Sequence, residues 1–190
     1  GKILRFITVA RFSEKKKGLD IIKNIASLLI DKKIQFKWLI VGKDSKLLLR
    51  NKFLRENKIY FDFIENIENI DENYFPNSKL VKIYKSCDLY LNLARIESFG
   101  ITIIEALASE LPVITFDTKG GNELIVNNLN GSVIEENNFN QFVEAFLMYK
   151  QINYYEKIKS NTIKSIIKFD LTNIAKKITN ILEENLKKLD

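Results

Sequence analysis

Two glutamates separated by seven residues form the most chemically distinctive pattern in this sequence. Glu97 closely follows an apolar run at residues 89–93, and Glu105 lies in a stretch composed almost entirely of Ile, Ala and Leu. A carboxylate among apolar side chains is costly to bury unless another group donates a hydrogen bond to it or pairs with its charge. We therefore expect Glu105 to have a polar partner. Glu97 is expected at the end of a strand, where open parallel sheets bind ligands.

Gly100 and the residues after it predict the start of a buried helix. Residues 101–109 are almost entirely apolar, which is typical of a helix surrounded by protein. The first amides of such a helix, those of residues 100–102, have no intrahelical acceptor and can bind an anion. Eight helical rises would place the two glutamates about 12 Å apart. An anion site between carboxylates at that separation suits the two ends of a nucleotide-sugar.

Several other polar or glycine positions are expected at the same edge of the sheet. Arg11 follows the first predicted strand, while Gly42 and Gly120 follow later ones. The carboxyl ends of parallel strands meet at one edge, so these residues and Glu97 should surround a single site.

The elements that must position these residues alternate between strand and helix. The expected strands are residues 3–9, 36–41, 59–64, 89–93, 112–116 and 131–134. The expected helices are residues 19–30, 46–57, 79–86 and 101–109, a short one that opens at Gly120, and long ones at 139–167 and 171–189. This alternation predicts an α/β fold with a doubly wound, six-stranded parallel sheet of Rossmann-like type. Residues 65–78 read as a long loop.

Composition excludes several classes of chemistry. Histidine is absent, which removes Ser-His and Cys-His catalysis and most zinc sites. No Asp-x-Asp pair is present to hold a divalent ion, so we expect neither a metal nor a cofactor. The single cysteine, Cys87, excludes an internal disulfide and fits a reducing compartment.

The net charge of +6 raises the question of an acidic partner. The lysines are scattered among glutamates rather than gathered with aromatic residues, so we expect no nucleic-acid partner. No apolar run is as long as a membrane span, and no signal peptide opens the chain. We expect a cytoplasmic protein whose basic face could bring it to the inner surface of the membrane.

Four segments of the chain carry a family resemblance. They are residues 9–20, with Arg11 and Lys17-Gly18; residues 97–106, with the two glutamates; the strand and glycine turn within 111–125; and the Phe169-Asp170 pair before the terminal helix. Together they resemble the C-terminal, donor-binding domain of the retaining GT-B glycosyltransferases of family GT4, the glycosyl transferases group 1. The resemblance covers nearly the whole chain, and residues 1–190 are expected to be this half of a GT-B fold.

The resemblance implies a metal-independent transfer from a nucleotide-diphosphate sugar, with a UDP-sugar favoured, to a glycan or lipid-linked acceptor of polysaccharide biosynthesis. Arg11 and Lys17 would hold the diphosphate and, with Glu97, serve catalysis. Glu97 would hold sugar hydroxyls, and Glu105 would accept from the ribose. The other residues implied to bind the donor are Ser98, Phe99, Gly100, Ile101 and Thr102, with Gly42, Gly120, Gly121 and Glu123 as weaker candidates.

Departures from the family pattern keep other interpretations open. Ala94 stands where the family commonly has Ser or Thr, and Ala10 where it usually has Gly. An N-terminal, acceptor-binding domain, the partner of this half in such enzymes, is not in the sequence, so we expect an excised domain that is inactive alone. A non-catalytic, degenerate binding module is the alternative. A dehydrogenase domain lacks the required G-x-G-x-x-G, and hydrolases place two carboxylates around one bond, where a buried Glu105 does not fit.

Overall fold

The strands form one parallel sheet. The computed structural model describes residues 3–12, 17–67 and 77–186. The strands are β1 (Leu4–Val9), β2 (Phe36–Val41), β3 (Phe61–Ile64), β4 (Leu89–Asn92), β5 (Val113–Phe116) and β6 (Gly131–Ile134). Their order is β3-β2-β1-β4-β5-β6, and each neighbouring pair is parallel. The predicted Rossmann-like α/β fold is confirmed.

The strand order reverses its direction between β1 and β4. The chain moves outward from β1 to β3, then crosses back to place β4 on the other side of β1. The loops that leave β1 and β4 therefore diverge to opposite faces of the sheet and leave a crevice between them. Open α/β sheets bind ligands at such a point, beyond the carboxyl ends of the strands.

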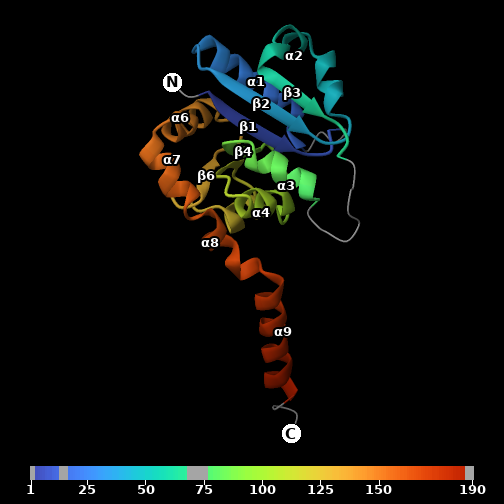
Figure 1. The fold of residues 1–190 in the computed structure, drawn as a ribbon, viewed down its shortest axis with the longest axis vertical. Helices are drawn as coiled ribbons and strands as arrows, with labels where there is room; N and C mark the ends of the chain where they lie inside the picture. The colour runs from blue at the N-terminus through green and yellow to red at the C-terminus, as the bar shows by residue number, and fades with distance from the viewer. Residues whose placement is uncertain (1–2, 13–16, 68–76, 187–190) are drawn as a thin grey trace.

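Helices cover both faces of the sheet (Figure 1). One face packs against α1 (Leu19–Asp31), α6 (Phe139–Tyr149) and α7 (Ile152–Lys159). The other packs against α3 (Ser78–Lys85), α4 (Ile101–Ala108), α5 (Lys119–Leu124) and α8 (Thr162–Ile166). Alternate strand residues fill the two layers: Phe6 stacks with Phe36 and meets Phe146 edge-on, whereas Tyr90 on the other face meets Tyr84. Both faces are thus buried, which explains the apolar strands.

Two of the predicted helices are wrong in extent. The expected helix at 46–57 is divided into a 3₁₀ helix, η2 (Ser45–Arg50), and α2 (Lys52–Glu56). Asn51 separates them, because its extended backbone ends η2 and its side chain accepts the amide hydrogen of Leu54 to cap α2. The start of the expected strand at 59–64 lies in η3 (Lys58–Tyr60).

The expected helix at 139–167 is divided into α6, α7, α8 and the short η4 (Ile167–Phe169). Gln151 has extended dihedral angles between α6 and α7. The break lets α7 turn so that Tyr155 and Ile158 are buried in the same core as α6. Burial of these side chains offsets the loss of helix continuity.

The last helix, α9 (Leu171–Leu186), projects away from the sheet (Figure 1). Ile174, Ile178 and Ile181 recur at helical spacing and are 38%, 53% and 49% exposed. An apolar stripe of this kind normally packs against protein. The described residues of this chain leave it exposed.

Candidate functional site

A cavity of about 660 Å³ opens at the carboxyl ends of β1, β2 and β4. It lies at the reversal of strand order, where the fold predicts a ligand site. Its wall comes from three loops and from the first turn of α4. The lining residues are Thr8, Val9, Ala10, Arg11, Lys17, Gly42, Lys43, Asn92, Leu93, Ala94, Glu97, Ser98, Phe99, Gly100, Ile101 and Thr102. Most of the residues singled out from the sequence therefore meet in one place.

The loop between β1 and α1 supplies two of the cations that line the cavity, Arg11 and Lys17. Arg11 is exposed at the end of β1, and Lys17 lies just before α1. Gly18 has a φ of 70°, and a β-carbon there would lie 1.9 Å from the carbonyl oxygen of Leu93. Only glycine fits this close approach, so Gly18 lets the Lys17 segment lie directly against the end of β4. Residues 13–16 lie outside the described residues.

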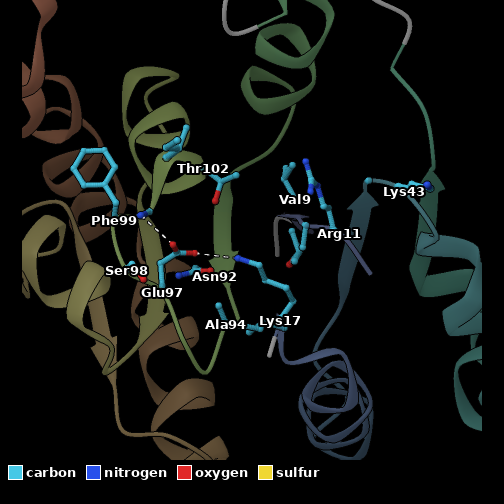
Figure 2. A pocket seen from close by; sticks show the side chains of 16 residues that line it. Val9, Arg11, Lys17, Lys43, Asn92, Ala94, Glu97, Ser98, Phe99 and Thr102 are labelled. Carbon is cyan, nitrogen blue, oxygen red and sulfur yellow. Dashed lines mark hydrogen bonds and ion pairs between the residues drawn. The ribbon is translucent and has the colours of Figure 1, made fainter. Parts of the chain in front are cut away.

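The Glu97 loop, residues 93–100, supplies the carboxylate. One oxygen of Glu97 accepts a hydrogen bond from the backbone amide of Gly100 at 3.1 Å. The other oxygen pairs with Nζ of Lys17 at 3.4 Å, with the two side chains 15% and 25% exposed. Figure 2 shows both contacts at the centre of the cavity. A cation and a carboxylate from distant segments thus meet between β1 and β4.

The backbone of the Glu97 loop is also fixed from the β5 side. The carbonyl oxygen of Glu97 accepts the amide hydrogen of Gly120 at 2.8 Å. A β-carbon on Gly120 would lie 2.9 Å from the backbone nitrogen of Phe99. Gly120 therefore acts through close packing, since its absence of a side chain allows the two loops to touch.

Arg95 holds the outer side of the Glu97 loop. Its guanidinium donates two hydrogen bonds to the carboxylate of Asp20 in α1, at 2.8 and 2.7 Å, and pairs with Glu136 after β6 at 3.2 Å. The hydrogen bonds from Arg95 lower the pKa of Asp20 below its ordinary value. The bidentate geometry fixes orientation as well as position. Sequence reasoning missed this link, because nothing local pairs Arg95 with either acid.

Glu105 has the polar partner that its burial implied. Its side chain is 9% exposed, and the hydroxyl of Tyr84 in α3 donates a hydrogen bond to it at 3.0 Å. Burial raises the pKa of Glu105, and the hydrogen bond from Tyr84 opposes that rise. Glu105 is not among the residues that line the cavity. Its proposed contact with a ribose stays a prediction.

The start of α4 is held by a second tyrosine. The hydroxyl of Tyr90 in β4 donates a hydrogen bond to Oγ1 of Thr102 at 2.7 Å. Phe99 and Ile101 are exposed at the mouth of the cavity, and the ring of Phe99 meets that of Phe169 edge-on. Gly100, Ile101 and Thr102 line the cavity, and amides in the first turn of a helix can serve an anion.

The weaker candidates are distributed differently. Gly42 lines the cavity, and its amide donates a hydrogen bond to the carbonyl oxygen of Ile64. Gly121 is buried in α5, where its amide donates to the hydroxyl of Thr118. Glu123 is exposed on α5 and does not line the cavity. The structure thus brings Gly42 to the cavity and leaves Gly121 and Glu123 outside its lining.

The sequence reasoning missed three polar residues that line the cavity: Thr8, Lys43 and Asn92. Asn92 ends β4 and is 5% exposed, and Lys43 follows Gly42. A signal for Asn92 was present, since it is the one amide side chain in the otherwise apolar run at 89–93. Buried polar side chains need partners, so an amide in a buried strand next to a site deserved the same scrutiny as Glu105.

Two classes of feature are absent from the described ranges. Within residues 3–12, 17–67 and 77–186, no three histidine, cysteine, aspartate or glutamate side chains gather as a metal site would require. In the same ranges, no helix combines the length and the apolar character needed to cross a bilayer.

The chain is similar to known proteins over most of its length. A family model described as glycosyl transferases group 1 matches residues 2–165. The chain belongs to this family. It is 28% identical over 135 residues to the poly(ribitol-phosphate) alpha-N-acetylglucosaminyltransferase of Staphylococcus aureus, which covers 69% of this chain and 25% of the relative.

Solved glycosyltransferase structures share the fold. Sucrose-phosphate synthase from Thermosynechococcus elongatus gives a TM-score of 0.79 at 17% identity and covers 98% of this chain and 46% of its own. Anabaena HepE, solved in complex with UDP and glucose, gives 0.77 at 17% identity, with 96% and 48% covered. The chain spans less than half the length of these relatives.

Proposed function

We propose that this chain is the donor-binding domain of a retaining, metal-independent glycosyltransferase that uses a UDP-sugar. The observation that carries the proposal is the cavity itself, where Lys17, Glu97 and the first turn of α4 face one space. A nucleoside diphosphate sugar offers negative charge for the cation and the helix amides, and hydroxyls for the carboxylate. The UDP and glucose bound to Anabaena HepE support the choice of donor.

The chemistry follows from the charges that the reaction creates. Transfer breaks the bond between the anomeric carbon and the diphosphate oxygen, the acceptor oxygen bonds to that carbon, and the proton of the acceptor hydroxyl passes to the leaving diphosphate. Negative charge grows on the leaving diphosphate, where Arg11, Lys17 and the α4 amides can stabilise it without a divalent ion. Positive charge grows at the anomeric carbon. Glu97 can stabilise this charge and also accept hydrogen bonds from sugar hydroxyls.

The ion pair between Lys17 and Glu97 fits this division of roles. In the structure each charge is partnered by the other at 3.4 Å. An arriving diphosphate competes for Lys17, and an arriving sugar competes for Glu97, so a complete donor replaces both halves of the pair at once. A nucleotide without its sugar would leave the carboxylate with only the Gly100 amide.

The remaining donor contacts rest on the resemblance. Ser98, Phe99, Gly100, Ile101 and Thr102 would offer main-chain groups to the sugar and the phosphates. Glu105 would accept from the ribose through the oxygen that Tyr84 leaves free, which requires the ribose to reach past the present cavity wall.

The proposal also implies a second domain and an acceptor. An N-terminal, acceptor-binding domain would complete the cleft, and the exposed stripe of α9, with Ile174, Ile178 and Ile181, offers it a packing surface. The acceptor would be a glycan or lipid-linked chain of polysaccharide biosynthesis, in the cytoplasm or at the inner membrane surface. This isolated domain would then bind donors without transferring sugar.

Thermal shift and calorimetry on the 190-residue chain test the proposal. We expect UDP, UDP-glucose or UDP-N-acetylglucosamine to raise the melting temperature in the presence of a chelator, because a ligand that binds only the folded state stabilises it. Adenosine diphosphate serves as the control for base selectivity. Stabilisation that requires magnesium or manganese would contradict the metal-independent mechanism. No response to any nucleotide would favour the non-catalytic module.

A further inference from the structure

The floor of the cavity contains an amide side chain with one half left unengaged. Asn92 is the last residue of β4 and is 5% exposed. Its Nδ2 donates a hydrogen bond to Oγ1 of Thr115 at 3.1 Å. Among the described residues, no hydrogen bond reaches its carbonyl oxygen. This oxygen is not enclosed by protein, because Oγ of Ser45 is the one fully buried side-chain polar atom without a partner among the described residues. Since Asn92 lines the cavity, its oxygen can accept a hydrogen bond from a group bound there.

The orientation of this amide is fixed by its neighbours. Oγ1 of Thr115 lies 3.2 Å from the carbonyl oxygen of Phe116 and donates its hydrogen there. Thr115 can therefore only accept from Asn92, which places the NH₂ group toward β5 and the carbonyl oxygen on the other side. Figure 2 shows Asn92 beside Glu97, with Lys17 across the same space.

The other polar group of the floor is already engaged. Oγ1 of Thr8 donates to the carbonyl oxygen of Leu91 and accepts from Nε1 of Trp38, both at 3.0 Å. Ala94 also lines the cavity and is too small to fill the space beside Asn92. The floor thus combines an oriented acceptor with open volume.

We propose that the carbonyl oxygen of Asn92 accepts a hydrogen bond from a hydroxyl or amide N–H of the donor's glycosyl unit, and so selects among donor sugars. A carbonyl oxygen accepts but never donates, and it repels phosphate oxygens. It therefore suits the sugar and not the diphosphate. This inference rests on the proposed function, and it assigns specificity to a residue outside the motif that carries Glu97 and Glu105.

The test compares UDP with a series of UDP-glucose analogues, each lacking one glycosyl hydroxyl, by calorimetry on the 190-residue chain. One analogue should bind the unchanged protein about ten- to a hundredfold more weakly than the parent sugar, since it leaves the Asn92 oxygen unsatisfied. In Asn92→Ala, this analogue should bind within about twofold of UDP-glucose, while the losses of affinity for the analogues that lack other hydroxyls persist. The comparison is a double-mutant cycle between the side chain and the hydroxyl. Affinity for UDP should not change.

The same measurement on Asn92→Leu keeps the side-chain volume, in case the alanine of Asn92→Ala destabilises the strand. Melting temperatures of both variants identify any loss of folded protein. If every loss of affinity is the same in the variants as in the unchanged protein, or if UDP and UDP-glucose weaken equally in well-folded variants, the assignment of Asn92 is wrong although the proposed function stands. If the unchanged protein binds none of these ligands, both proposals fall together.

Discussion

Removing the hydroxyl of Tyr84 should destabilise the protein in a way that depends on pH. Tyr84 is fully buried and donates its only polar hydrogen to Glu105. Tyr84→Phe keeps the ring and its edge contact with Tyr90 but leaves the Glu105 carboxyl without this donor. Because burial already raises the pKa of Glu105, loss of the opposing hydrogen bond should raise that pKa further.

The size of the effect follows from the charge of the acceptor. A hydrogen bond to a neutral group contributes about 0.5–1.5 kcal/mol to stability, and one to a charged group about 1.5–3 kcal/mol. Below pH 4 Glu105 is protonated in the folded and unfolded states, so Tyr84→Phe should cost about 1 kcal/mol. The unfolded state is the same for both proteins, so the extra cost appears as the pH rises through the raised pKa of Glu105 in the folded state. Above that pKa the unchanged protein ionises Glu105 with Tyr84 as donor, whereas the folded variant must bury an ionised carboxylate with no donor or retain the proton. The cost should therefore rise to about 2–3 kcal/mol by pH 8.

Urea unfolding at pH 4 and pH 8 measures this difference. Tyr149→Phe is the matched control, since Tyr149 is equally buried but its hydroxyl lies 3.0 Å from the neutral hydroxyl of Ser132. Its cost should be the same at both pH values. Equal costs for Tyr84→Phe at pH 4 and pH 8, or a matching rise in Tyr149→Phe, would refute the assignment of an ionisable acceptor.

Three further predictions concern the ligand site. Lys17→Ala should weaken UDP binding in calorimetry while the melting temperature changes little, because a partly exposed ion pair contributes less than about 1 kcal/mol to stability. Lys17→Glu should weaken UDP binding further. Unchanged affinity in both variants would exclude a contact between Lys17 and the diphosphate. Glu97→Gln should spare UDP but remove any preference for UDP-glucose, and equal losses for both ligands would contradict its role at the sugar. Gly120→Ala should weaken UDP-glucose more than UDP, since the new methyl group would displace the backbone of Phe99; Gly121→Ala, which is directed at Thr118 and Phe116 instead, provides the comparison.

The parts of the structure that the sequence predicted are those set by local patterns and by one topological rule. Buried strands and amphipathic helices are visible in short windows. The placement of Arg11, Gly42 and Glu97 around one cavity followed from the rule that parallel strands end at one edge. The sequence did not predict that Lys17 pairs with Glu97, 80 residues later. The need for a partner at Glu105 followed from the cost of burying a carboxylate, although nothing in the sequence named Tyr84.

The features that the sequence did not predict depend on tertiary contacts. Asp20 and Glu136 look like ordinary surface acids until the fold brings both to Arg95. The break at Gln151 lies in a segment whose apolar spacing is compatible with one continuous helix, and only packing of α7 on the sheet selects two. Asn92 stands out as the amide in an apolar run, but its role depends on which side of β4 faces the cavity, and only the folded structure shows that.

The fastening of the Glu97 loop has a consequence for how fast a donor can bind. This loop is tied to Gly120 and, through Arg95, to α1 and the segment after β6, by contacts that a bound donor leaves in place. Ordering a free loop would cost about 1–2 kcal/mol per residue, and binding that must wait for such ordering reaches a limiting rate at high ligand concentration. Here the sugar meets a surface that already has its shape. The observed association rate should therefore increase linearly with donor concentration in stopped-flow experiments.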